Sequence, residues 1–160
     1  MPHVTMELVS QAYGALASMN KDEIAKYWDE KMVWQVPGRN TLSGWYRSRD
    51  EFLAFMGRVG EMSGGSFKMT PITVCINDEY SADITRNEGN RAGEPDKKLD
   101  IEVVHVLRWR DGKVIAGRGA IFGDGTAEYD HFWSPLPVKG QTESQKEALD
   151  KAADDVFKGR

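Results

Sequence analysis

Cysteine is nearly absent from this chain, since Cys75 is the single one among 160 residues. A lone cysteine has no partner within the chain, so an internal disulfide is excluded, which suits a reducing cytoplasm. No apolar run approaches the roughly 18 residues that a membrane helix needs. The first residues lack a basic segment followed by an apolar one, so we expect no secretory signal. The sequence therefore predicts a cytoplasmic protein that does not use a membrane as partner.

An excess of positive charge is also missing, because 21 Lys and Arg stand against 25 Asp and Glu for a net charge of −4. This balance offers no electrostatic attraction for nucleic acid. The three histidines, His3, His105 and His131, are scattered without zinc-motif spacing, so we expect no metal site. Motifs for phosphate loops, dinucleotide loops and serine nucleophiles are absent too.

The first third of the chain carries the spacing of helices. Apolar residues recur at three- and four-residue intervals after Thr5, a candidate N-cap. Asn20 and Glu23 have capping-box spacing before a second short helix. Ser48 and Glu51 open a third helix, which glycines close. We therefore expect three helices at the N-terminal end.

From residue 66 onward the apolar pattern changes to period two, which is typical of strands. An irregularity is expected at Pro71, because proline cannot donate to a ladder. The polar segment 87–96 and the segment 39–48 read as loops, whereas Asp111-Gly112 is a strong hairpin signal. The expected strands are 32–36, 66–76, 80–86, 99–109 and 113–122, with a short helical turn at 126–133.

Helices followed by an antiparallel sheet indicate the α+β class. We expect a curved antiparallel sheet wrapped against the N-terminal helices, which forms a cone with an internal pocket. Residues 1–137 are predicted to form a single domain. Residues 138–160 are predicted to form a polar helical or flexible C-terminal tail.

The hairpin gives the sharpest functional inference. If Asp111-Gly112 is a two-residue loop, regular pairing places His105 opposite Arg118 within an otherwise apolar face. A guanidinium beside an imidazole favours the neutral imidazole, and the two together suit an enolate, phenolate or carboxylate. Two alternatives stay open: Arg118 neutralises a nearby acid while His105 is a satisfied core residue, or the register is shifted.

Several other side chains are candidate pocket residues, and the sequence allows two interpretations of most of them. Gln35 points either into the cone or to solvent, and Tyr13 is either core or ligand contact. Asp124 reaches the pocket mouth or caps the last helical turn, whereas Asp83, between apolar neighbours, is expected to face solvent. The remaining candidates belong to the core and are expected in part to line the cavity: Trp34, Phe52, Phe55 and Met56.

Three segments carry a resemblance to a known family: NKDEIAKYWDEKMVWQVPG, LSGWYRSRDEFLAFMGRVGEMSGG and DIEVVHVLRWRDGKVIAGRGAIFGDGTAEYDHFW. They resemble the SnoaL-like proteins of the nuclear-transport-factor-like cone fold, over roughly Val4 to Trp133. The resemblance implies a protein without a cofactor, and a homodimer formed through the outer sheet face. The same cone hosts polyketide cyclases, ketosteroid isomerases, epoxide hydrolases, dehydratases and non-catalytic binders. Residues that could make the dimer contact are Val104, Val106, Ile115 and Ile121.

Residue by residue, the resemblance matches some catalytic positions of the related enzymes and not others. Tyr13 falls near the tyrosine that donates to the enolate in ketosteroid isomerases, and His105 near their protonated acid. Gln35 stands near the place of their general base, and an amide cannot accept that proton at neutral pH. The arginine partner pattern of epoxide hydrolases is missing around Asp83. Asp124 is similar to the acid/base residue of SnoaL-like cyclases.

The leading hypothesis is a cofactor-independent acid/base enzyme, a cyclase, isomerase or dehydratase, for a hydrophobic carbonyl-containing metabolite. Arg118 and His105 would hold the developing oxyanion, Tyr13 and Gln35 would orient the ligand, and Asp124 or His105 would move the proton. The alternatives are a non-catalytic small-molecule-binding or accessory dimer subunit and an epoxide hydrolase.

Overall fold

The computed structural model describes residues 3–135, so the predicted tail at 138–160 lies outside the described residues. None of the helices within that range combines the length and apolarity that crossing a bilayer requires. The elements, in chain order, are α1 (Met6–Ser18), α2 (Lys21–Tyr27), β1 (Trp28–Val36), β2 (Gly44–Tyr46), α3 (Arg49–Met62), β3 (Lys68–Ile76), β4 (Tyr80–Arg91), β5 (Glu94–Arg110), β6 (Lys113–Ile121) and α4 (Gly125–Trp133).

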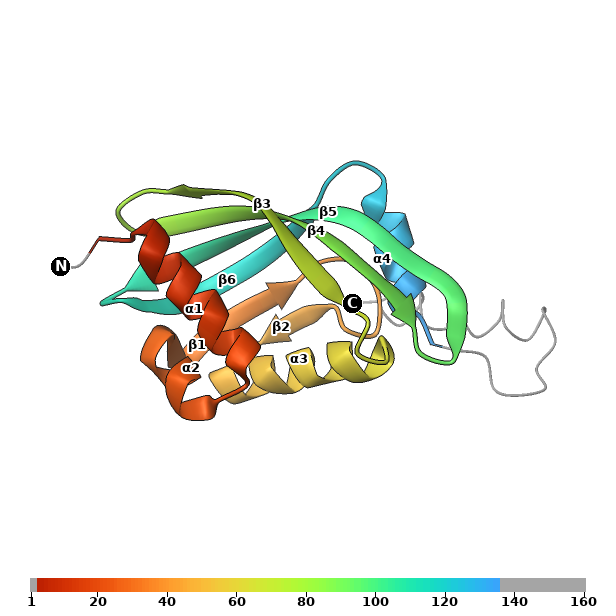
Figure 1. The fold of residues 1–160 in the computed structure, drawn as a ribbon, viewed down its shortest axis with the longest axis horizontal. Helices are drawn as coiled ribbons and strands as arrows, with labels where there is room; N and C mark the ends of the chain where they lie inside the picture. Colours follow the sequence, from red (N-terminus) through yellow and green to blue (C-terminus); the bar gives the residue numbers. More distant parts are fainter. Residues whose placement is uncertain (1–2, 136–160) are drawn as a thin grey trace.

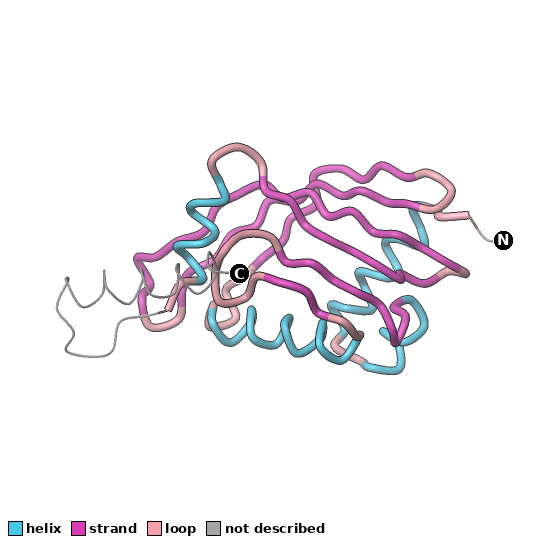
Figure 2. The backbone as a smooth tube through the Cα atoms, turned by 180° about the vertical axis from the view of Figure 1, so that it is seen from behind, coloured by secondary structure: helices cyan, strands magenta, loops and turns pink. Residues whose placement is uncertain are grey.

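A curved six-stranded sheet in the order β2-β1-β6-β5-β4-β3 forms the body of the molecule. The helices α1 and α3 lie along its concave side (Figure 1), and the view from behind shows the long strands curving over them (Figure 2). Within the described sheet, neighbours pair antiparallel except β1 and β6, which run parallel. The predicted α+β class and the open, cone-like sheet are thereby confirmed.

Side-chain caps begin the first and third helices as predicted. The hydroxyl of Thr5 accepts a hydrogen bond from the Leu8 amide at 3.0 Å, and that of Ser48 accepts one from the Glu51 amide at 3.1 Å. Each cap satisfies one of the amides that a helix N-terminus leaves without an internal partner. The caps therefore fix where each helix starts.

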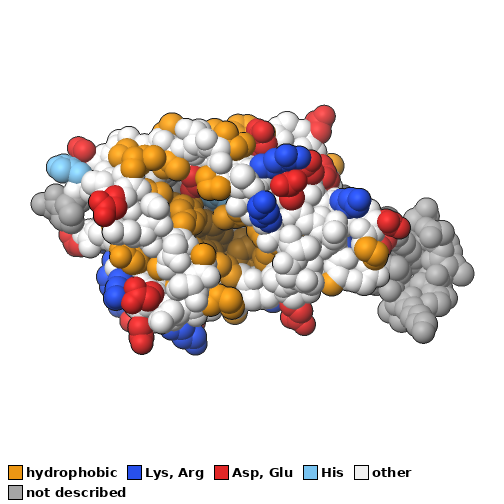
Figure 3. Space-filling view, in the orientation of Figure 1, with side chains coloured by type: hydrophobic (Ala, Val, Ile, Leu, Met, Phe, Trp, Pro, Cys, Tyr) orange, Lys and Arg blue, Asp and Glu red, His pale blue; other side chains and the backbone are white. Residues whose placement is uncertain are grey.

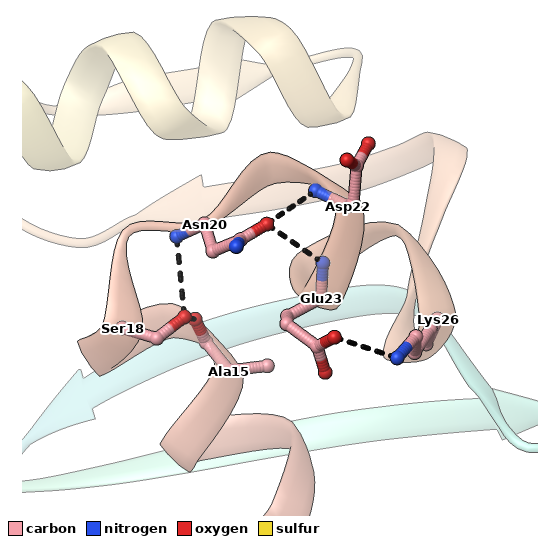
Figure 4. Close-up of polar contacts among 6 residues, drawn as sticks. All are labelled: Ala15, Ser18, Asn20, Asp22, Glu23 and Lys26. Atoms are coloured by element: carbon pink, nitrogen blue, oxygen red, sulfur yellow. Dashed lines mark hydrogen bonds and ion pairs between the residues drawn. The ribbon is translucent and has the colours of Figure 1, made fainter.

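The corner between α1 and α2 is held by Asn20 (Figure 4). Its side-chain oxygen accepts from the amides of Asp22 at 2.9 Å and Glu23 at 3.2 Å. The reciprocal half of a capping box is absent, because the Glu23 carboxylate binds Lys26 at 2.6 Å and the Asn20 amide donates to the Ser18 hydroxyl at 3.1 Å. The Asn20 side chain thus caps α2 without help from Glu23, and its backbone amide holds the turn that separates α2 from α1.

Two predicted loops contain strands. Segment 87–96 was expected to be exposed loop, but β4 and β5 continue through it as far as a tight turn at Ala92-Gly93. Segment 39–48 includes the short strand β2, which pairs with β1. Pairing with a neighbouring strand satisfies the backbone groups and outweighs the weak strand propensity of these polar residues.

The β5–β6 hairpin turns at Asp111-Gly112 as predicted, with φ values of 51° and 76° that suit a two-residue turn. The register beyond the turn differs from the prediction. Pairing shifts between Trp109 and Arg108, so one extra residue enters β6. A shift of one residue moves every later side chain of that strand to the opposite face.

Aromatic rings fill the core where β1 meets α3. The ring of Phe52 lies 4.7 Å from that of Trp34 and 5.4 Å from that of Trp28, between centroids. Gly117 on β6 faces the same cluster, because a Cβ placed there would lie 2.3 Å from the Trp34 ring. The close approach of indole and backbone therefore requires glycine at this position.

Replacing Gly117 by alanine should destabilise the fold by about 1–3 kcal/mol, because Trp34 has to move out of its packing. The measurement is urea denaturation followed by circular dichroism. Gly119→Ala is the matched control on the same strand, since its nearest neighbours are at an ordinary contact distance of 3.5 Å. Equal stability of the two variants would contradict the packing described.

Candidate functional site

A hollow opens on the concave side of the sheet, between α1, α3 and β3, and hydrophobic side chains surround it (Figure 3). Trp34 and Phe52 are buried in the core cluster beneath this region, whereas Phe55 and Met56 on α3 are half-buried against that cluster. Their predicted role as ligand contacts stays a prediction. The hollow matters because the polar groups described next lie on the same face of the sheet.

Asp83 and His105 form a buried pair on adjacent strands. They are direct partners in the β4–β5 ladder, and His105 Nδ1 lies 3.0 Å from Asp83 Oδ1. Asp83 is 3% exposed and His105 is 9% exposed. Burying a carboxylate is costly unless hydrogen bonds compensate it, so this contact is a structural requirement as well as a chemical feature.

Tyr13 completes the arrangement from the helix side. Its hydroxyl donates to Asp83 Oδ2 at 2.5 Å, which ties α1 to β4. Burial raises the pKa of Tyr13 well above its ordinary value, and the negative charge and hydrogen bond of Asp83 raise it further. The phenol therefore stays protonated and remains a donor at physiological pH.

The second ring nitrogen of His105 is open. No described residue hydrogen-bonds Nε2, and this atom is not fully buried. A carboxylate at Nδ1 favours the tautomer with the proton on Nδ1 and the lone pair on Nε2. Trp34 lies beside the imidazole, with 5.9 Å between ring centroids. The arrangement can accept a proton at Nε2 and stabilise the resulting cation.

The predicted pairing of His105 with Arg118 is wrong. His105 opposes Gly119, and Arg118 opposes Val106 on the other face of the sheet, where it is exposed. The extra residue in β6 near the hairpin causes this exchange of faces. The anion site that was inferred from the pair does not form.

The expectation that Asp83 faces solvent is also wrong. Its apolar neighbours, Ala82 and Ile84, lie on the outer face of the sheet and are the more exposed ones. Both faces of β4 therefore run against the usual pattern, in which polar residues of a strand point outward. The sequence did show that Ser81, Asp83 and Thr85 alternate with less polar residues and therefore share one face. The same alternation occurs whether that polar face is exposed or buried.

Gln35 and Asp124 lie apart from the buried pair. Gln35 opposes Arg118 and Trp45, so it shares the outer face with them. Asp124 is exposed and precedes α4, but its side chain makes no capping hydrogen bond. Among the described residues, no hydrogen bond connects either side chain with Asp83 or His105. The catalytic and ligand-orienting roles predicted for them gain no support from this placement.

Cation ligands are not grouped in this part of the chain. Residues 3–135 include no cluster of three or more His, Cys, Asp or Glu side chains placed to hold a metal ion. The hydrogen-bonded group of His105, Asp83 and Tyr13 instead combines an imidazole, a carboxylate and a phenol, which suit hydrogen bonding and proton transfer.

The model of the SnoaL-like domain matches residues 9–117. The chain belongs to the SnoaL-like domain family. Bal32a, from a soil-derived mobile gene cassette, is 31% identical over 79% of this chain and 94% of its own, with a TM-score of 0.70. This family assignment confirms the resemblance inferred from the sequence.

More distant structures share the fold. A protein of unknown function with a cystatin-like fold, from Xanthomonas campestris, is 20% identical, with a TM-score of 0.70 over 81% of this SnoaL-like chain and 98% of its own. TerC, co-crystallized with polyporic acid, is 17% identical, with a TM-score of 0.64 over 81% of this chain and 97% of its own. A comparison with curated proteins gives no match.

In the wild-type SnoaL-like protein, His105 should carry its proton on Nδ1 when neutral, because Asp83 accepts from that nitrogen. Nitrogen-15 NMR of the histidine side chains at mildly alkaline pH measures this directly. Asp83→Asn should mix the two tautomers, since an amide can donate as well as accept. His3 and His131 serve as internal controls, and a wild-type His105 protonated on Nε2 would contradict the arrangement.

Proposed function

We propose that this SnoaL-like protein is a cofactor-independent acid/base enzyme for a hydrophobic carbonyl-containing small molecule. The observation that carries the proposal is the buried Asp83–His105 pair, whose Nε2 opens toward space on the concave face. A general base needs a lone pair within reach of the substrate and a partner that stabilises its protonated form. His105 supplies the lone pair and Asp83 supplies the stabilising charge.

In the proposed reaction the substrate lies in the hydrophobic hollow, with an acidic C–H bond next to its carbonyl group directed at His105. Nε2 takes the proton, and the electrons of the broken C–H bond move to the carbonyl oxygen as an enolate. The Asp83 carboxylate stabilises the imidazolium, and Tyr13 keeps that carboxylate in place. Return of the proton at another atom gives isomerisation. Attack of the enolate carbon on a second carbonyl carbon of the same molecule gives cyclisation, because the π bond of that carbonyl opens and its oxygen takes the proton back from the imidazolium.

Structural relatives support a small organic ligand. TerC was co-crystallized with polyporic acid, so one protein of this fold accommodates an organic acid of that kind. Hydrophobic side chains surround the hollow of the present chain (Figure 3), which favours a ligand with an extended apolar surface. The supported ligand class is therefore hydrophobic and oxygen-bearing.

The geometry of Asp83 and Gln35 bears on the two competing functions, an epoxide hydrolase and a non-catalytic binder. Direct activation of water by Asp83, as an epoxide hydrolase requires, is disfavoured because both carboxylate oxygens already accept hydrogen bonds from Tyr13 and His105. In the sequence, the main support for a non-catalytic binder was Gln35, because an amide stands there where ketosteroid isomerases carry their general base. That argument no longer applies, because Gln35 lies on the outer face and not in the hollow.

Proton abstraction is testable without the natural substrate. The wild-type protein should accelerate exchange of the α-protons of hydrophobic ketones, such as 2-tetralone, in deuterated water, as followed by proton NMR. His105→Ala should lower the accelerated rate by about 10²–10⁴-fold, the usual contribution of a general base. Asp83→Asn should lower it as well, because the tautomer is no longer fixed.

Arg118→Ala distinguishes the observed register from the pairing inferred from the sequence. Since Arg118 lies on the outer face, its replacement should leave the exchange rate unchanged.

If ketones bind to the wild-type protein but none exchanges its α-protons faster than in buffer, the protein is a binder and the proposed reaction is wrong.

The protein is further proposed to be a homodimer that associates through the outer face of the sheet. The described helices pack on the inner face, and the outer face carries half-buried apolar residues, among them Ile84, Val104 and Val106. Apolar surface of this kind favours contact with a second copy. Ile121, which was included in the expected contact, instead opposes the buried Val103 on the inner face.

Light scattering after size exclusion should show a dimer for the wild-type protein. A variant with Val104→Glu and Val106→Glu should be monomeric and folded, because both side chains are only half-buried. Met19→Glu is the control for added charge, since Met19 directly follows α1 and is 83% exposed. A monomeric wild-type protein would refute the proposed interface.

A further inference from the structure

The inner face of β4 buries a row of polar side chains. Ser81, Asp83, Thr85 and Asn87 occupy alternate positions, so they point to the same side of the sheet. Their exposed fractions are 0%, 3%, 4% and 4%. Buried polar groups are almost always hydrogen-bonded, so the partner of each one is informative.

All four have a described hydrogen-bond partner, but Asn87 has one for its Oδ1 atom alone. Ser81 accepts from the Trp109 indole at 2.9 Å, and Asp83 is held as described above. The Thr85 hydroxyl donates to Asn87 Oδ1 at 2.8 Å. This bond sets the orientation of the Asn87 amide and leaves its Nδ2 group, with two N–H donors, without a partner among the described residues.

The unpaired amide group is accessible. Asn87 Nδ2 is not fully buried, although the residue as a whole is. An unpaired buried donor destabilises a protein. A donor kept at the wall of a hollow is instead available to a ligand oxygen.

The position of Asn87 relative to the proposed base is set by β4. The two residues Asp83 and Asn87 are four apart, which corresponds to about 13 Å along a strand. The Asp83 end lies under α1 through the Tyr13 contact. Beyond Asn87 the strand runs toward the C-terminal end of α3, where the Ala92 amide donates to the Met62 carbonyl at 2.8 Å.

Apolar side chains flank the stretch of β4 between the two polar positions. Val103 opposes Thr85 and Ile101 opposes Asn87 on β5, and both are buried. On the other side, Met69 of β3 opposes Asn87 and is partly exposed. The inner face of this part of the sheet therefore carries the Asp83–His105 pair near one end and the Asn87 amide donor near the other, with Thr85 and the apolar Val103 between them.

We infer that Asn87 is a specificity-determining residue that donates a hydrogen bond to an acceptor oxygen at the far end of an elongated, hydrophobic ligand. The reacting end of that ligand lies at His105, so the inference rests on the proposed function and defines its substrate class. Thr85 is a positioning residue, because it holds the carbonyl end of the Asn87 amide and directs the N–H groups outward.

Two matched probes test the inference: 4-acetyl-4′-hydroxybiphenyl and 4-isopropyl-4′-hydroxybiphenyl. Their hydroxyl groups donate to His105 Nε2, and their other ends have similar shape but differ in the acceptor oxygen. Titration calorimetry gives the ratio of the two affinities for each protein. Asn87→Leu should weaken binding of the acetyl compound relative to the isopropyl compound by about threefold to tenfold. This change corresponds to the loss of one neutral hydrogen bond.

A second variant guards against misfolding. Asn87→Asp keeps the size of the side chain and the acceptor for Thr85 but lacks the N–H donors, so it should lose the acetyl preference as well. Asn90→Leu is the matched control, because Asn90 is exposed and its side chain has no hydrogen bond with a described residue. It should leave the affinity ratio unchanged.

The outcomes separate this inference from the proposed function. His105→Ala should weaken both probes alike and preserve their ratio, because it acts at the shared hydroxyl. An unchanged ratio in both Asn87 variants, together with probe binding that depends on His105, would overturn the inference and leave the proposed function standing. Failure of both probes to bind the wild-type protein would contradict the ligand-binding hollow, and with it both proposals.

Discussion

The buried carboxylate of Asp83 is the group on which the inner architecture of this protein depends. Removing a carboxylate from water costs several kcal/mol unless charge-assisted hydrogen bonds replace its hydration. Tyr13 and His105 provide those bonds from two different elements, α1 and β5. The same contacts therefore hold the first helix on the sheet and orient the imidazole. One set of interactions thus serves the packing of the helix and the orientation of the proposed base.

The division of the sheet into two faces decides which residues act together. One extra residue in β6 moves Arg118 outward and places Gly119 opposite His105. Because no side chain stands opposite the imidazole on β6, the ring packs beside Trp34, which itself needs Gly117 for space. Small residues on one strand thus create room for large ones on its neighbours. The polar row of β4 lies on the same inner face, so the proposed ligand recognition and the proposed proton transfer involve one face of the sheet.

Much of the fold could be predicted because its signals are local. Thr5, Asn20 and Ser48 mark helix starts through short-range hydrogen bonds, and Asp111-Gly112 has the backbone freedom that a tight turn demands. The candidate site was predicted less well. His105 and Tyr13 were identified as candidates, but Asp83 was assigned to solvent and Arg118 to the pocket. Both errors concern which face of a strand points inward, and alternation alone does not give that answer when one face is polar and buried.

The sequence by itself determined the α+β class, the helix starts and the hairpin, because capping, turn formation and apolar periodicity act over a few residues. The family followed separately, from the resemblance of three long segments to SnoaL-like proteins. Only the tertiary structure decided the register of β6, the burial of Asp83 and the meeting of Tyr13 with it across 70 residues of chain. These features depend on which strands become neighbours and where one residue is inserted. The physical reason is that a single-residue bulge costs little locally, yet it reverses the faces of the rest of the strand.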